Sequence, residues 1–158
     1  SGSMFLTTHA LVGAMVGEAA PDPISAFFLG ATSHFIIDMI PHGDSKQYDN
    51  YKNKEKVKRA LAYVISDAAL AIITVEWMHN SVTSAHPLNR TMGIIGGILP
   101  DLLIGLAEFL HLKPLYKYVQ FHFFFHNFFV RRYHDIKLHQ GIIMQLFVLV
   151  LLVKIIAQ

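Results

Sequence analysis

The stretch 29–44, LGATSHFIIDMIPHGD, holds the two residues whose types and spacing are best suited to chemistry. His34 and Asp38 lie four positions apart in an apolar helical pattern that stops at Pro41. On a helix this spacing puts both side chains on one face, one turn apart, where they could bind one metal ion together. The alternative is a hydrogen-bonded His–Asp pair in a core, which is the commoner arrangement in soluble proteins. The solvent around the helix therefore decides between the two interpretations.

Further candidate ligands lie in other apolar segments. His122 and His126 share the i, i+4 spacing within QFHFFFHNFF, and His9 lies near the start of the chain. This spacing suits zinc, although it also recurs by chance. Asp67 and Asp101 interrupt two apolar runs. Because the chain has no cysteine, any metal must be held by His, Asp and Glu.

The composition is typical of a membrane protein. Hydrophobic residues make up 53% of the chain and charged residues only 15%, against about 25% charged residues in soluble domains. The formal net charge of +2 is too small to indicate a nucleic-acid partner. Ser1-Gly2-Ser3 resembles a cloning remnant, no removable signal peptide is recognisable, and residues 4–158 are expected to form a single integral-membrane helical domain.

The elements expected around these residues are all helical. One amphiphilic segment, Lys113–Arg132, is expected to be an interfacial or half-inserted helix, and Ser45–Arg59 a basic surface loop that faces the cytoplasm. Because successive spans alternate in direction, the connections at Pro21–Pro23 and His79–Arg90 are then expected on the outer face of the membrane. The predicted fold is an all-α, polytopic membrane helical bundle with about five spans, six shorter helices being the alternative. The predicted spans are Met4–Ala20, Ile24–Ile40, Ala60–Met78, Thr91–Leu110 and Gly141–Ala157.

The titratable residues converge at one depth in this topology. At about 1.5 Å of rise per residue, those of the first four spans fall in the cytoplasmic half of the bilayer, and the later histidine pair approaches from the same side. Ionisable residues in a membrane are costly and usually mark a site. Singly, His9 and Glu108 could be interfacial and Asp67 could cap a helix or pair with a lysine. Taken together, the titratable residues of these apolar segments predict a metal centre. Its expected ligands are His9, His34, Asp38, Asp101, His122 and His126.

This combination resembles a known family. An early His9, the HxxxD pair, a helix-borne Pro100-Asp101 and a later histidine pair are similar to the membrane-bound metal-dependent hydrolases related to zinc-dependent phospholipase C. The resemblance covers about Thr8 to Asn127 and implies an all-helical protein whose His and Asp ligands hold zinc. By this resemblance His34 and Asp38 match the HxxxD ligands, His9 the early histidine and Asp101 the acid of the PD motif.

The chain departs from that family's pattern in three ways. Leu103 and Ile104 stand where the family has a second Asp and a His. HFFFHN lacks the Arg-Gly and Thr of the HRGxTHS type, and the order of the motifs differs.

The expected activity is hydrolysis of a phosphoester. One to three zinc ions, or other divalent ions, would activate a water that attacks phosphorus in line. Asp67 or Glu108 could accept the proton of this water, which makes them the candidate catalytic residues. A membrane lipid is the expected partner and a lipid or other phosphoester the substrate, in the inner membrane of a prokaryote. The basic residues Lys113, Lys117, Arg131 and Arg132 could hold an anionic head group, but ordinary positive-inside anchoring is the preferred interpretation.

Other classes of function compete with hydrolysis. A haem-binding electron carrier would need the histidines but not the carboxylates beside them. A metal or proton transporter would need polar residues through both halves of the membrane, whereas the outer halves are nearly bare of titratable groups. A non-catalytic membrane protein that binds metal is the third alternative.

Overall fold

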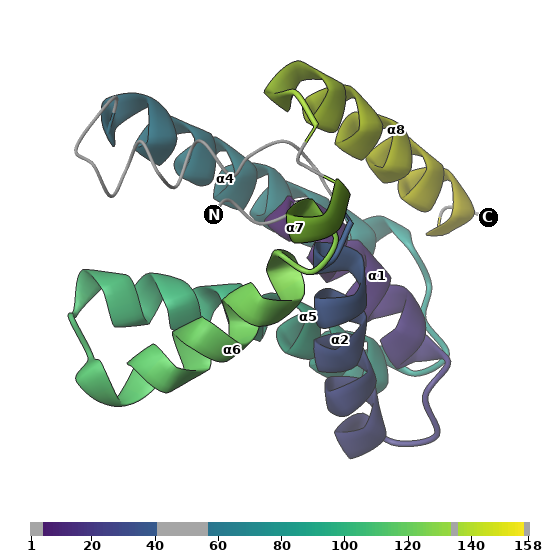
Figure 1. The fold of residues 1–158 in the computed structure, drawn as a ribbon. Helices are drawn as coiled ribbons and strands as arrows, with labels where there is room; N and C mark the ends of the chain where they lie inside the picture. The colour runs from purple at the N-terminus through teal and green to yellow at the C-terminus, as the bar shows by residue number, and fades with distance from the viewer. Residues whose placement is uncertain (1–4, 41–56, 134–135, 157–158) are drawn as a thin grey trace.

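The computed structural model describes residues 5–40, 57–133 and 136–156, with the side chains of a few of these left undescribed, and over these ranges the protein is helical without strands (Figure 1). This confirms the predicted all-α fold. The suggested cloning remnant at 1–3 and residues 45–56 of the predicted basic loop lie outside the described residues. The last three residues of that predicted loop, from Val57 to Arg59, already belong to a helix.

Two short helices, α1 (Leu6–Glu18) and α2 (Pro23–Asp38), form a helical hairpin across the predicted connection at Pro21–Pro23. Asp22 begins α2, because its carboxylate accepts hydrogen bonds at 2.9 Å from the backbone N–H groups of Ile24 and Ser25. At 13 and 16 residues, these helices are roughly 20 and 24 Å long. They fall short of the hydrocarbon core of a bilayer, which is about 30 Å thick.

Three long helices, α4 (Val57–Ser81), α5 (Pro87–Phe109) and α8 (Leu138–Ile156), are apolar enough to cross a membrane. They indicate membrane association, but five spans are not confirmed, because α1 and α2 do not reach that length. The helix ends also differ from the expected ones. The fourth helix begins at Pro87 rather than Thr91, since proline is favoured in the first helical turn, where its missing N–H has no partner anyway.

The predicted helix over Lys113–Arg132 is divided into a 3-10 turn, η1 (Lys113–Leu115), and two helices, α6 (Tyr116–His126) and α7 (Val130–Tyr133). The chain reverses direction after α5, where His111 adopts a φ of 51°. As a result α6 runs back beside the end of α5, and the two form a helical hairpin that projects from the bundle (Figure 1). This hairpin returns the histidines of α6 to the bundle.

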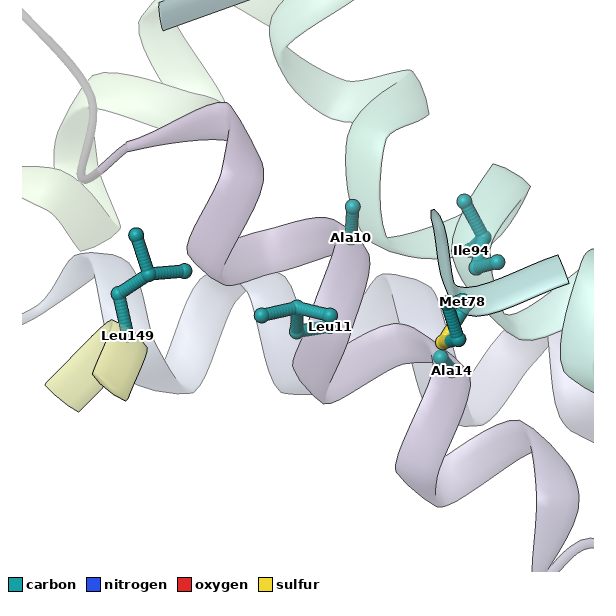
Figure 2. Close-up of a cluster of buried hydrophobic side chains, with 6 residues drawn as sticks. All are labelled: Ala10, Leu11, Ala14, Met78, Ile94 and Leu149. Atoms are coloured by element: carbon teal, nitrogen blue, oxygen red, sulfur yellow. The ribbon is translucent and has the colours of Figure 1, made fainter. Parts of the chain in front are cut away.

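Glycines allow α1, α2 and α5 to pack backbone against backbone. A Cβ on Gly93 of α5 would lie 2.1 Å from the carbonyl oxygen of Gly13 in α1, and a Cβ on Gly30 of α2 would lie 2.2 Å from that of Gly93. Only glycine leaves room for helices this close. Outside this contact, side chains at the core join α1 to α4, α5 and α8 (Figure 2). They are Ala10, Leu11, Ala14, Met78, Ile94 and Leu149.

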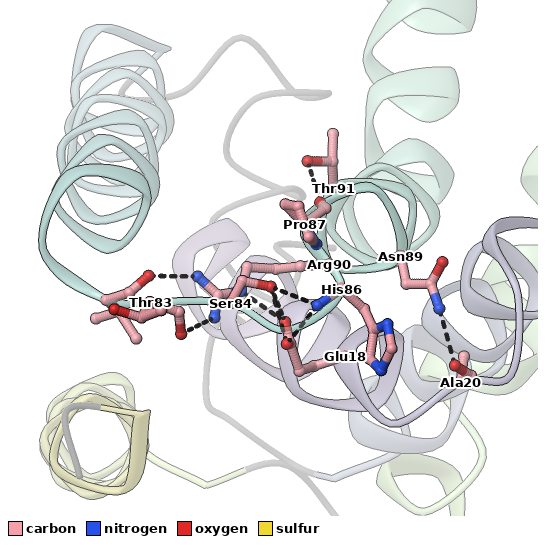
Figure 3. A network of polar contacts seen from close by, with 10 residues as sticks. Glu18, Ala20, Thr83, Ser84, His86, Pro87, Asn89, Arg90 and Thr91 are labelled. Carbon is pink, nitrogen blue, oxygen red and sulfur yellow. Dashed lines mark hydrogen bonds and ion pairs between the residues drawn. The ribbon is translucent and has the colours of Figure 1, made fainter.

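A polar network closes one end of the bundle (Figure 3). The carboxylate of Glu18, at the end of α1, accepts hydrogen bonds from Ser84, from the backbone N–H of His86 and from Arg90 Nε at 2.9 Å. Burial alone would raise the pKa of Glu18, but these hydrogen bonds outweigh it and lower the pKa below its ordinary value. The α1–α2 and α4–α5 connections therefore meet at the same end, as the predicted topology requires.

Candidate metal centre

The opposite end of the bundle carries His34 and Asp38, one turn apart on α2 and both buried. Nδ1 of His34 lies 2.8 Å from the backbone oxygen of Gly97 in α5. Because a carbonyl can only accept, Nδ1 of the neutral ring carries the proton and Nε2 presents its lone pair toward Asp38. Metal-binding histidines are commonly oriented in this way.

Two more helices bring a carboxylate and an imidazole to the same place. Asp101 of α5 lies with its Oδ1 3.7 Å from the Nε2 atoms of both His34 and His122. His122 of α6 lies with its Nε2 3.2 Å from Asp38 Oδ2. One ligand atom from each of these four residues lies within 4.8 Å of all the others. We call this set, His34, Asp38, Asp101 and His122, the four-residue group.

The four-residue group could hold a divalent metal ion. With zinc–ligand distances of about 2.1 Å, the ligand atoms of a tetrahedral site lie roughly 3.4 Å apart. The measured His–Asp separations in the group run from 3.2 to 3.9 Å. Two carboxylates beside two neutral imidazoles also balance the charge of one divalent ion. Nε2 of His34 makes no hydrogen bond with any described residue, so this group could hold a metal ion.

Solvent reaches the group at Asp101. His34, Asp38 and His122 are at most 2% exposed, whereas the side chain of Asp101 is 15% exposed. Tyr118 lies on the same side, one turn before His122, and its hydroxyl donates to the backbone oxygen of Pro100 at 3.2 Å. Asp101 is therefore the member of the group closest to solvent.

The two other predicted ligands lie beside the four-residue group and are not part of it. Nε2 of His9 is 3.5 Å from Oδ1 of Asp38, and its ring centre is 4.0 Å from that of His34. Neither ring nitrogen of His9 makes a hydrogen bond with a described residue. His126 is buried one turn beyond His122, with 6.3 Å between their ring centres, and its Nδ1 faces the side-chain oxygen of Asn127 at 3.4 Å.

The two predicted catalytic residues also lie outside the four-residue group. Asp67 of α4 caps the start of α1, because its carboxylate accepts from the backbone N–H of Leu6 at 2.7 Å and from the hydroxyl of Thr7 at 3.1 Å. This confirms the helix-capping alternative for Asp67. Glu108 lies two turns beyond Asp101 on α5 and is half-buried.

Sequence reasoning missed two residues beside the site and one that holds the start of α1. Gly97 provides the carbonyl for His34, Tyr118 contacts Pro100, and Gln145 of α8 accepts from the backbone N–H of Phe5 at 2.6 Å. The i, i+4 spacing of Tyr118 and His122 could have indicated that the two share a face. Nothing in the sequence around Gly97 or Gln145 indicates their contacts, because both join residues far apart in the chain.

No family model, no curated protein and no solved structure matches the chain.

Proposed function

We propose that this protein is an integral-membrane, metal-dependent hydrolase that acts on a lipid or other phosphoester. The observation that supports it is the convergence of His34, Asp38, Asp101 and His122 from three helices, with their ligand atoms within 4.8 Å of one another. The resemblance to membrane-bound hydrolases related to zinc-dependent phospholipase C points to the same activity. Zinc suits the donor set, because imidazole nitrogens and carboxylate oxygens are among its preferred ligands.

A divalent ion bound here would lower the pKa of a coordinated water and polarise a phosphoryl oxygen. The residues of the chain have separate roles. His34 and His122 would hold the ion through Nε2. Asp38 lies between the group and His9, because its Oδ2 faces the group while its Oδ1 faces His9. Asp38 and His9 would help to hold any second ion on that side, and we propose one to three ions in all.

Asp101, which would hold the ion in this proposal, would also lie beside the attacking water. Its side chain is the part of the four-residue group that solvent reaches. Asp67, by contrast, already accepts hydrogen bonds from the start of α1. Glu108 remains a prediction as an alternative base.

The setting of the site favours a substrate at the membrane surface. Asp38 ends α2, directly before the segment 41–56 that carries the basic residues. If that segment faces the cytoplasm of a prokaryotic cell, as the positive-inside rule indicates, the metal centre opens at the cytoplasmic face of the inner membrane. Phosphoesters of lipid head groups lie at this level.

The test is elemental analysis of detergent-purified protein after zinc loading and removal of free metal. Wild type is compared with His34→Ala/Asp38→Ala. The matched control, Glu76→Ala/His79→Ala, removes an exposed carboxylate and an exposed imidazole from α4. We expect at least one zinc per chain in wild type and control and none in the site variant. Loss in the control as well would show that the zinc binds elsewhere.

The same preparations are then given phospholipids and the chromogenic diester bis(p-nitrophenyl) phosphate. Turnover that requires zinc and is lost in the site variant supports the hydrolase. Stoichiometric zinc without turnover on any phosphoester would instead favour the non-catalytic metal-binding alternative. Absence of zinc from wild type would overturn the proposal.

A further inference from the structure

The tip of the hairpin between α5 and α6 exposes apolar and aromatic side chains. We call residues 109–117, FLHLKPLYK, the hairpin tip. Phe109 is 81% exposed, Leu110 51% and Tyr116 44%. The tip projects away from α1 and α2 (Figure 1). Large apolar side chains this exposed mark a surface that contacts another molecule or the membrane.

The hairpin tip is also positively charged. Lys113 and Lys117 are both exposed, and neither forms an ion pair with a described residue. The sequence from 109 to 133 contains no Asp or Glu at all. The nearest preceding acid, Glu108, is half-buried. The surface therefore offers two lysines to an anionic partner and no opposing charge.

The position of the tip identifies the partner. α5 is long and apolar enough to cross a membrane, and it ends at Phe109. Residues that follow such a span lie at the level of the lipid head groups, where aromatic rings and lysines are both favoured. Phosphates of anionic lipids attract lysines at this depth. Arg131 and Arg132 lie beyond the other end of α6, roughly 16 Å along that helix, so the tip is a separate basic surface.

We propose that the hairpin tip binds the head groups of anionic phospholipids, with its aromatic and aliphatic side chains inserted among the acyl chains. This proposal is independent of any metal or catalytic activity. The binding fixes the depth of α6, which carries His122.

The experiment uses the full chain in vesicles. Trp77 is the single tryptophan, so the variant Trp77→Phe/Tyr116→Trp carries one fluorophore at the tip. Its quenching is compared for brominated phosphatidylglycerol and brominated phosphatidylcholine at equal mole fraction. We expect the anionic lipid to be enriched by about fivefold per lysine at low salt. The enrichment should disappear in about 1 M salt, because the Debye length there is only roughly 3 Å and the lysines no longer attract the lipid phosphates.

Two comparisons separate the lysines from a general effect of charge. Adding Lys113→Gln/Lys117→Gln should equalise quenching by the two lipids, whereas Lys113→Arg/Lys117→Arg should preserve the difference. In the protein without these substitutions, Trp77 lies near the C-terminal end of α4. Quenching of its fluorescence reports whether anionic lipid is enriched around the whole protein. Equal quenching by both lipids in the parent reporter, absence of quenching by either, or a preference that survives the glutamine substitutions would each overturn the proposal.

Discussion

Replacing Gly93 by alanine should force α1 and α5 apart. The new Cβ would lie 2.1 Å from the Gly13 carbonyl oxygen and 2.7 Å from the Cα of Gly17. Both atoms belong to the backbone of α1, so no side-chain rotation can relieve the clash. Cβ contacts below 3.0 Å essentially never occur. The helices must therefore separate by about 1 Å, in a core that tolerates such changes poorly.

The energetic cost can be isolated with a matched variant. Alanine is favoured over glycine inside a helix by about 1 kcal/mol, which would partly hide the steric cost. Gly105→Ala lies on the same helix and meets nothing within 4 Å, so it gains the propensity without a clash. The difference in unfolding free energy between the two variants then gives the steric cost of the new Cβ alone. We expect about 3 kcal/mol, the upper end for overpacking, because the obstructing atoms are backbone.

The assay is thermal unfolding in detergent, followed by circular dichroism. For a chain of this size, 3 kcal/mol corresponds to a separation of about 6–12 °C between the two midpoints, with Gly105→Ala the more stable. The same displacement should weaken zinc binding in Gly93→Ala, since Gly97 of the displaced helix orients His34. Coincident midpoints would refute the close packing of α1 on α5.

Three further outcomes can be checked on the same preparations. Asp67→Asn should lower the unfolding midpoint by about 2–4 °C through loss of about 1 kcal/mol of charged capping, while metal content stays unchanged; loss of metal would contradict the capping role. Tyr118→Phe removes the hydroxyl that contacts Pro100 and should cost about 1 kcal/mol of unfolding free energy with zinc retained, which a zinc titration of the unfolding midpoint would show. The pKa of Glu18 is lowered in the folded protein, so its contribution to stability is complete above the ordinary value of 4.5 and is lost as the pH falls through the lowered pKa. The free energy of unfolding, measured from pH 7 to 3, should therefore fall less steeply in Glu18→Gln than in wild type. The same fall in both proteins would show that the pairing of Glu18 with Arg90 is not linked to folding.

Much of the fold follows from local signals, but the ends of the helices do not. The break at Pro21–Pro23 and the apolar pattern that follows it predict α2, whose start is set by a local cap, Asp22. The start of α1 is set by Asp67, which lies about sixty residues away in the sequence. A hydropathy pattern measures the length of an apolar run and cannot register such a remote cap. For this reason the first predicted span, Met4–Ala20, begins before the start of α1.

The sequence could predict which residues lie at the same depth in the membrane, but not which of them bind together. Spacing pairs His34 with Asp38, and depth brings Asp101 and His122 to the same level. Depth does not decide which of two neighbouring histidines faces inward. His122 and His126 lie one turn apart on α6 and both are buried, so neither spacing nor depth selects the one that joins the group. The structure places His122 in the four-residue group because α6 returns beside α5 at that height.

The distribution of the four-residue group over α2, α5 and α6 has a consequence for biosynthesis. Eighty-four positions separate Asp38 from His122, which is roughly 4–17 s of synthesis at 5–20 residues per second. During that interval the nascent α1–α2 hairpin holds His34 and Asp38 without their partners and without the glycine face of α5. If the group binds a metal, its full ligand set would be complete only once α6 has emerged and docked. Because metal binding adds its free energy to folding, the ion would stabilise completed chains selectively and leave truncated ones exposed to proteolysis.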